Sequence, residues 1–200
     1  FVRGGVAGKG RSHVVATRLI VRDTVSRKDG TTGDGISVEG GALLELDMAA
    51  VVRARRAGIL LNNLTSPDGL PSEAMIAHTV VRDTQAAGDG LGPAAEGAIP
   101  LEGVGIAAGG KLTLTSRAVT GNVQFGVVVG GANSAGSSVT STLVAGTQAR
   151  ASGDFGHGFV GVDGTSVVVR NTVLLSNVIG AAFESATATL ADVLVEKNQV

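Results

Sequence analysis

A short glycine-led block that returns along the chain constrains the fold more than any other feature of the sequence. Each copy opens on Gly, continues with three mostly small or apolar residues, and is followed by a turn or a loop. The copies lie at residues 35–38, 58–61, 105–108, 126–129, 158–161 and 180–183. A chain that repeats one short unit in this way is an array of similar structural units.

Two further apolar segments lie between successive glycine blocks. The first alternates apolar and polar residues, as in Lys111–Thr115, which is typical of a strand with one buried face. The second is short and often ends in Asp or Asn. Its first apolar residue recurs, with a mean spacing of 29 residues, at Ile20, Val51, Val80, Val119, Leu143, Leu174 and Leu194. Regular content at irregular spacing predicts three strands per coil, joined by loops of variable length.

The composition fits a narrow interior between parallel strands. Hydrophobic residues make up 44% of the chain and aromatic residues only 2%, so the apolar mass is Val, Leu, Ile and Ala. We therefore predict an all-β parallel solenoid of six to seven coils, with strands about 4.8 Å apart. Residues 1–200 are expected to form one domain, with 1–12 as a cap or a partial coil. Because the ends of a solenoid expose strand edges, the native protein is expected to continue into further coils or a cap.

Two local features leave room for alternatives. Residues 47–57 have helical propensity, but their place in the repeat predicts a strand and a turn. The Asp or Asn that ends the second segment is consistent with a side-chain ladder along the solenoid or with ordinary turn chemistry.

Taken together, the Gly-Ile-x-Val blocks, the alternating strand and the terminal Asn or Asp resemble the right-handed parallel β-helix repeats of the pectin-lyase-like superfamily. The resemblance covers residues 13–200. It implies a right-handed parallel β-helix, an extracellular or cell-surface location, and a polysaccharide or cell-surface partner. That superfamily includes lyases, glycoside hydrolases and adhesins, so the resemblance is more specific for fold than for function.

A second period, about two coils long, appears in the connections. Long connections at 25–34, 85–104 and 148–157 alternate with short ones at the same corner of the solenoid. Each long connection contains Gly-Asp, which makes Asp34, Asp89 and Asp154 the candidate ligand-binding residues. A row of carboxylates suits polar ligands or Ca²⁺, the one cofactor considered. The alternative is a turn dipeptide copied by duplication.

Charge and motifs exclude several classes of function. The net charge is −1, so there is no basic field to hold nucleic acid. No apolar run approaches the about 18 residues of a membrane helix, so membrane insertion is not expected. The absence of Cys excludes a thiolate metal site. The histidines at positions 13, 78 and 157 are isolated in the sequence and are expected to be exposed or to lie in turns.

Paired carboxylates leave an enzymatic function open. Glu45 and Asp47 lie two residues apart on an outward strand face, and glycoside hydrolysis uses two carboxyls about 5–10 Å apart. The absence of Trp and Tyr argues against sugar stacking. The 85–104 loop carries Asp89, Glu96 and Glu102. Ten of its twenty residues are Gly or Ala, so we expect it to lie flat as padding, that is, as a connection whose carboxylates do not converge in a groove. The favoured prediction is a non-catalytic secreted or surface scaffold, adhesion or glycan-interaction module. The alternative is a polysaccharide lyase or glycoside hydrolase acting on the long-loop face.

Overall fold

The computed structural model shows an all-β protein whose paired strands run parallel. It describes residues 2–4, 12–25, 33–62, 66, 68–86, 103–115 and 117–199, with the backbone alone at 2–4. One helical segment occurs in this part of the chain, the three-residue 3₁₀ helix η1 (Ala132–Ser134). The strands form two sheets. The predicted all-β class and parallel pairing are confirmed.

The first sheet holds the glycine blocks. Its strands, in spatial order, are β1 (Val2–Gly4), β4 (Ile36–Val38), β7 (Ala57–Leu61), β10 (Val104–Ala108), β13 (Phe125–Gly130), β16 (His157–Val162) and β18 (Ile179–Glu184). Each block therefore coincides with one strand, as the repeat predicts.

The second sheet holds the other two segments of the repeat as two columns of strands. The alternating segments give the first column: β2 (His13–Thr17), β5 (Leu43–Asp47), β8 (Glu73–Ala77), β11 (Lys111–Thr115) and β14 (Ser137–Thr140). The short segments give the second column: β3 (Ile20–Arg22), β6 (Ala50–Val52), β9 (Val80–Arg82), β12 (Ala118–Thr120) and β15 (Leu143–Ala145). Two longer strands extend through both columns: β17 (Ser166–Leu175) and β19 (Thr187–Glu196).

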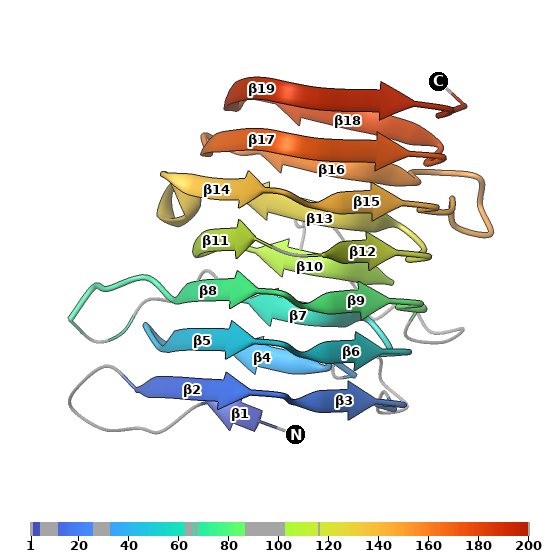
Figure 1. Cartoon of the computed structure of the whole chain (residues 1–200). Helices are drawn as coiled ribbons and strands as arrows, with labels where there is room; N and C mark the ends of the chain where they lie inside the picture. The colour runs from blue at the N-terminus through green and yellow to red at the C-terminus, as the bar shows by residue number, and fades with distance from the viewer. Residues whose placement is uncertain are drawn as a thin grey trace.

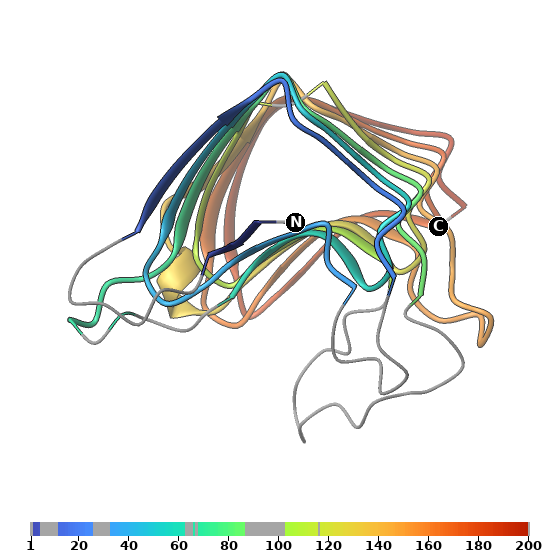
Figure 2. The same cartoon turned by 90° about the horizontal axis from the view of Figure 1, so that it is seen from below.

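Stacked layers are the building principle of the molecule. The first sheet forms one column of strands and the second sheet forms two. We call a layer the three consecutive segments that contribute one position to each of these columns, such as β4, β5 and β6. Strands pair with their counterparts in the next layer, as β5 does with β8 and β8 with β11. Figure 1 shows the layers rising from β1–β3 to β18 and β19. Viewed along the stack, the three columns form a three-sided outline around an interior (Figure 2).

Two series of left-handed residues turn the chain at corners of this outline. Where the first column of the second sheet meets its second column, φ lies between 47° and 56° at Arg18, Met48, His78, Ser141, Asn171 and Asp192. After the second column, φ lies between 53° and 65° at Asp23, Arg53, Asp83, Gly121, Gly146, Ser176 and Lys197. This conformation costs a non-glycine residue about 1–2 kcal/mol. The stacked strands on both sides stabilise the bend at the same position in each layer.

The structure separates the Asp and Asn residues that the sequence pattern grouped together. Asp23 and Asp83 are the left-handed corner residues and lie at the surface. Asn122 and Asn177 lie one position later and are buried. Turn chemistry therefore applies to the aspartates, and the ladder to the asparagines.

The asparagine ladder joins neighbouring layers through side-chain oxygens. The backbone N–H of Thr84 donates to Asn122 Oδ1 at 3.1 Å, and that of Thr147 donates to Asn177 Oδ1 at 3.0 Å. The N–H of Asn177 donates in turn to Asn198 Oδ1 at 2.9 Å. These bonds satisfy buried donors at a corner where the regular sheet pairing is interrupted.

A column of glycines explains why each block opens on Gly. A Cβ placed on Gly105 would lie 2.5 Å from the Gly126 carbonyl oxygen and 2.7 Å from Val119 Cγ1. The equivalent glycines at 35, 58, 126 and 158 meet the carbonyl oxygen of the next glycine in the column in the same way, whereas the atoms nearest a Cβ on Gly180 belong to the Val195 and Asn198 side chains. Only a residue without a side chain fits where the first-sheet strand passes this close to its neighbours.

The short strands correct one part of the predicted register. The predicted anchors Ile20, Val80 and Leu143 lie at the same position in successive strands. The residues at that position on the other strands are Ala50, Ala118 and Val173. The predicted anchors Val51, Val119 and Leu174 are therefore wrong by one residue, since they occupy the buried middle position of their strands. Both positions are apolar, so hydrophobicity did not distinguish them.

The predicted strand and turn at residues 47–57 are confirmed. β5 ends at Asp47, β6 follows at Ala50–Val52, and β7 begins at Ala57. Stacking against β9 on one side and β3 on the other overrides the helical propensity.

The structure tests only part of the predictions about where the domain begins and ends. Within 1–12, Val2–Gly4 form β1, which pairs with β4 as a strand of the lowest layer. Residues 1 and 5–11 lie outside the described residues. The single domain over 1–200 and its continuation into further coils or a cap stay predictions.

Candidate functional site

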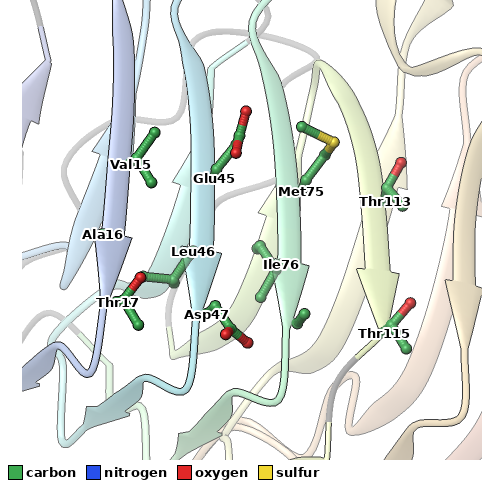
Figure 3. Close-up of a pocket in the computed structure, with 11 residues that line it drawn as sticks. Val15, Ala16, Thr17, Glu45, Leu46, Asp47, Met75, Ile76, Thr113 and Thr115 are labelled. Atoms are coloured by element: carbon green, nitrogen blue, oxygen red, sulfur yellow. The ribbon is translucent and has the colours of Figure 1, made fainter.

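A groove on the outer face of the second sheet is the candidate functional site. The groove is open to solvent, has a volume of about 340 Å³, and crosses β2, β5, β8 and β11 (Figure 3). Its lining residues are Val15, Ala16, Thr17, Glu45, Leu46, Asp47, Met75, Ile76, Ala77, Thr113 and Thr115. The groove therefore runs along the stack, across successive layers.

Strand alternation determines which side chains face the groove. Leu44 and Leu46 of β5 point into the core, so Glu45 and Asp47 point outward. Parallel pairing then aligns Glu45 with Val15, Met75 and Thr113 in one row. It aligns Asp47 with Thr17, Ala77 and Thr115 in a second row. Carboxylates, hydroxyls and small apolar groups thus lie on one open surface.

Each groove carboxylate is partnered by a histidine from a neighbouring layer. His13 Nε2 lies 2.8 Å from Glu45 Oε1, and His78 Nδ1 lies 2.8 Å from Asp47 Oδ1. All four side chains remain exposed to solvent. The predicted exposure of these histidines is confirmed, but their pairing with carboxylates was missed. The sequence did contain a signal for this pairing. His13 and Glu45 are 32 residues apart and Asp47 and His78 are 31 apart, close to the mean spacing of the repeat.

This arrangement is suited to hydrogen bonding with a polyhydroxylated ligand. Carboxylate oxygens accept hydrogen bonds from hydroxyls, and threonine hydroxyls both donate and accept. Residues two apart on a strand have Cα atoms about 6.7 Å apart, within the span of paired catalytic carboxyls. An acid catalyst, however, needs a dry environment that keeps one carboxyl protonated. Glu45 and Asp47 are both open to water.

Asp34, one of the predicted ligand-binding residues, lies in a different environment. Its side chain is mostly buried at the start of β4 and is paired with Arg56. Arg56 Nε donates to Asp34 Oδ1 at 2.9 Å, and the Arg56 terminal amino group donates to Oδ2. Burial raises the pKa of Asp34, and the hydrogen bonds from Arg56 oppose that rise. The carboxylate is thus already neutralised within the protein.

Asp154 lies at an exposed turn, and Asp89 lies outside the described residues. The Asp154 carbonyl accepts a hydrogen bond from the Arg150 N–H at 3.0 Å, which closes the turn. Asp34 directly precedes its column glycine, Gly35, whereas Asp154 lies four residues before Gly158. The structure therefore does not bring these two aspartates into one row. Binding of a ligand at Asp34, Asp89 or Asp154 stays a prediction.

The third long connection folds against the outer face of the first sheet. Phe155 packs edge-on against Phe125, with ring centroids 5.2 Å apart, and the Arg150 guanidinium lies 5.3 Å from the centre of the Phe155 ring. The His157 ring lies 5.6 Å from that of Phe125. Burial lowers the pKa of His157, which favours its neutral form. These contacts fix the connection on an apolar surface that includes Val104 and Val128.

Neither a metal centre nor a membrane helix emerges from the described residues. Among them, no group of three or more His, Asp or Glu side chains is placed to hold a metal ion. The same part of the chain contains no helix long and apolar enough to cross a membrane. Residues 87–102, which include Asp89, Glu96 and Glu102, lie outside the described ranges, so the predicted padding of that loop stays untested.

Comparison with protein-family models, with curated proteins and with solved structures found no match to this chain.

Proposed function

We propose that the chain is a right-handed parallel β-helix of the pectin-lyase-like kind, with six to seven coils of three strands. Parallel pairing between equivalent strands of neighbouring layers, the two series of corner residues and the glycine column support this architecture. All three features recur along the stack at equivalent positions, as a solenoid requires.

We further propose that the protein is a non-catalytic binding module, secreted or displayed at a cell surface, whose ligand is a polysaccharide. The groove on the outer face of the second sheet supports this function best. It is open at the surface and crosses four strands about 4.8 Å apart, so an extended chain fits it better than a compact molecule. Glu45, Asp47 and the threonines provide hydrogen-bonding groups along its length.

A glycan screen with matched variants tests this proposal. The double variant Glu45→Gln and Asp47→Asn keeps the shape of the groove but removes both charges. The double variant Asp163→Asn and Glu184→Gln removes the same charge from exposed positions outside the groove. We expect the first variant to bind its glycan about tenfold more weakly or worse, since hydrogen bonds to charged groups contribute about 1.5–3 kcal/mol each. The second should bind as the wild type does.

The screen is run with and without Ca²⁺, because binding of a ligand or of Ca²⁺ at the long connections, which carry Asp34, Asp89 and Asp154, stays a prediction. Binding that needs Ca²⁺ and is lost on replacing Asp154 would move the site to the long connections. Absence of binding to every glycan in both conditions would contradict the binding function.

An enzymatic function is the alternative, favoured by one observation. Glu45 and Asp47 are two outward carboxylates, each hydrogen-bonded to a histidine, in one groove. A polysaccharide lyase or glycoside hydrolase would release new chain ends from a bound polysaccharide. A reducing-end assay on the glycans that bind separates the two proposals: release of ends that Glu45→Gln abolishes would replace the binding module with an enzyme.

A further inference from the structure

The outer face of the second column in the second sheet is apolar along the stack. The middle residues of its strands, such as Val119, point into the core, so the residues on either side of them point outward. The outward row that contains Leu143 is apolar in every layer: Ile20, Ala50, Val80, Ala118, Leu143, Val173 and Leu194. No described segment lies over this face, which forms the upper right side of the outline in Figure 2, so the row stays partly open to water.

The centre of this face carries no charge in either outward row. In β12, β15 and the second half of β17, the other outward row consists of Thr120, Ala145 and Leu175. The corner residues that follow these strands are also uncharged: Gly121, Gly146 and Ser176. A contiguous apolar surface that is only partly buried is typical of a site of contact with another protein surface.

Charged residues flank this centre with opposite signs on its two sides. The β9 layer carries Arg82 followed by Asp83, and the β19 layer carries Glu196 followed by Lys197. Arg82 and Glu196 share the second outward row, and Asp83 and Lys197 share a corner position. Within one copy, Arg82 lies 3.4 Å from Asp83 and Lys197 lies 3.6 Å from Glu196, at exposed positions where such pairs contribute little. The two flanks are therefore complementary to each other.

A two-fold axis through β15, parallel to the strands, brings the complementary flanks of two copies together. This axis keeps the direction of the strands and reverses the order of the layers. Because β9 and β19 each lie two layers from β15, β9 faces β19 of the second copy. Arg82 then opposes Glu196 of the second copy, and Asp83 opposes its Lys197. By symmetry each of these pairs occurs twice.

The same axis brings apolar side chains together along the whole row. Leu143 meets its own counterpart at the axis, Ala118 meets Val173, and Val80 meets Leu194. Face-to-face packing of these side chains removes apolar surface from water.

The remaining charges on this face do not oppose the contact. Arg117, just before β12, comes near the uncharged Asn171 of the second copy. His78 comes near Asp192 at the same corner. Among the described residues of these five layers, no like charges are placed against each other.

The size of the face indicates how stable the contact is. Five layers about 4.8 Å apart and about six residues along each strand give a face about 20 Å on each side. Its area of about 400 Å² per copy is below the about 800 Å² of a standard stable interface, so a weak dimer is expected.

From these observations we propose that two copies of the chain associate face to face through the second column, as a closed two-fold dimer. The groove lies on the first column, so the grooves of both copies stay open in the dimer. The proposal therefore does not rest on the polysaccharide-binding function.

Sedimentation velocity at protein concentrations from about 1 µM to about 1 mM tests the proposal. We expect a monomer–dimer equilibrium that saturates at two copies, since a two-fold contact closes on itself. Leu143→Asp places two carboxylates against each other at the axis and should weaken the dimer about a hundredfold or more. Val168→Asp is the matched control, because Val168 is also an outward, partly buried residue but lies in the first column. It should leave the dimer unchanged.

Charge variants test the register of the contact. Arg82→Glu and Glu196→Arg each oppose like charges and should weaken the dimer about tenfold. A double variant with both changes in one chain restores opposite signs and should dimerise as the wild type does. Arg22→Glu is the control, since Arg22 is exposed in the same row but lies outside the five layers. Circular dichroism establishes that each variant is folded, and the charge variants are sufficient if Leu143→Asp does not fold.

Three results would overturn the proposal. The first is a monomer at every concentration, and the second is association beyond two copies. The third is a dimer that Leu143→Asp and Val168→Asp weaken equally. If the protein is monomeric and Leu143→Asp abolishes glycan binding, the face binds the glycan and not a second copy. Failure of the glycan screen leaves the proposal standing, because the dimer face and the groove lie on different columns.

Discussion

At the scale of single residues, the ion pair of Asp34 and Arg56 shows how this fold treats a charge near its interior. The carboxyl lies beside the first-sheet strand β4, largely out of the water. Two hydrogen bonds from Arg56 offset part of the cost of removing it from solvent. Burial is nevertheless the larger effect, since the pKa of Asp34 is raised above its ordinary value of 3.8.

This raised pKa gives Asp34→Asn a specific pH signature. In the unfolded chain Asp34 loses its proton near pH 3.8, and in the folded protein it does so at a higher pH. Between these values the folded state binds more protons, so the free energy of unfolding falls as pH rises. Asp34→Asn removes that contribution. We expect wild-type stability to fall relative to the variant through this window, as urea unfolding at a series of pH values would show.

At neutral pH the free energy of unfolding of Asp34→Asn should lie within about 1 kcal/mol of that of the wild type. Breaking a fully buried ion pair costs more, about 3–5 kcal/mol. Arg56 is partly exposed and can be hydrated when its partner is lost. A wild type that gains stability over the variant as pH rises would contradict the argument.

The groove pairs show what single-residue patterns leave out. His13 and Glu45 are 32 residues apart, and their contact depends on the lengths of every connection between their layers. The sequence predicts that Glu45 points outward, because alternation along one strand determines that. It does not predict the partner on the neighbouring strand, because register between strands depends on the stacking of whole layers.

At the scale of strands, the glycine column makes a second prediction. Gly105→Ala would place a Cβ 2.5 Å from the Gly126 carbonyl oxygen, a backbone atom held within the parallel sheet. We expect a loss of about 3 kcal/mol or more in the free energy of unfolding, since neither strand can move without breaking its ladder. Gly153→Ala is the control. Gly153 has φ of +86° but no atom within 4 Å of its added Cβ, so about 1–2 kcal/mol is expected.

Urea unfolding of the two variants measures the difference. Equal costs would contradict the argument, since they would mean that the close approach of the Gly126 carbonyl oxygen adds nothing beyond the ordinary cost of a strained glycine position.

The strands also show which part of the fold could be read from the sequence. The glycine blocks mark the first-sheet strands because a steric requirement repeats at the same position in each layer. The corner residues were harder, since Asp23 and Asn122 differ by one position in the repeat and end segments of similar composition. The left-handed corner tolerates Asp, Arg, Ser, Lys and Gly, so residue type alone does not locate it.

At the scale of the whole molecule, each layer is stabilised by the layers on either side. Leu112 and Val119, in the middle of the stack, are fully buried, whereas Leu190 at the β19 end is half exposed. A stack of layers with contacts only between neighbours opens most readily where a layer has a neighbour on one side only. For the 200-residue chain we therefore expect amide hydrogen exchange to be slowest in β10–β12, which have described partners on both sides, and faster in β2, β3 and β19, which have a described partner on one side. Uniform protection across the layers would instead indicate a single cooperative unit.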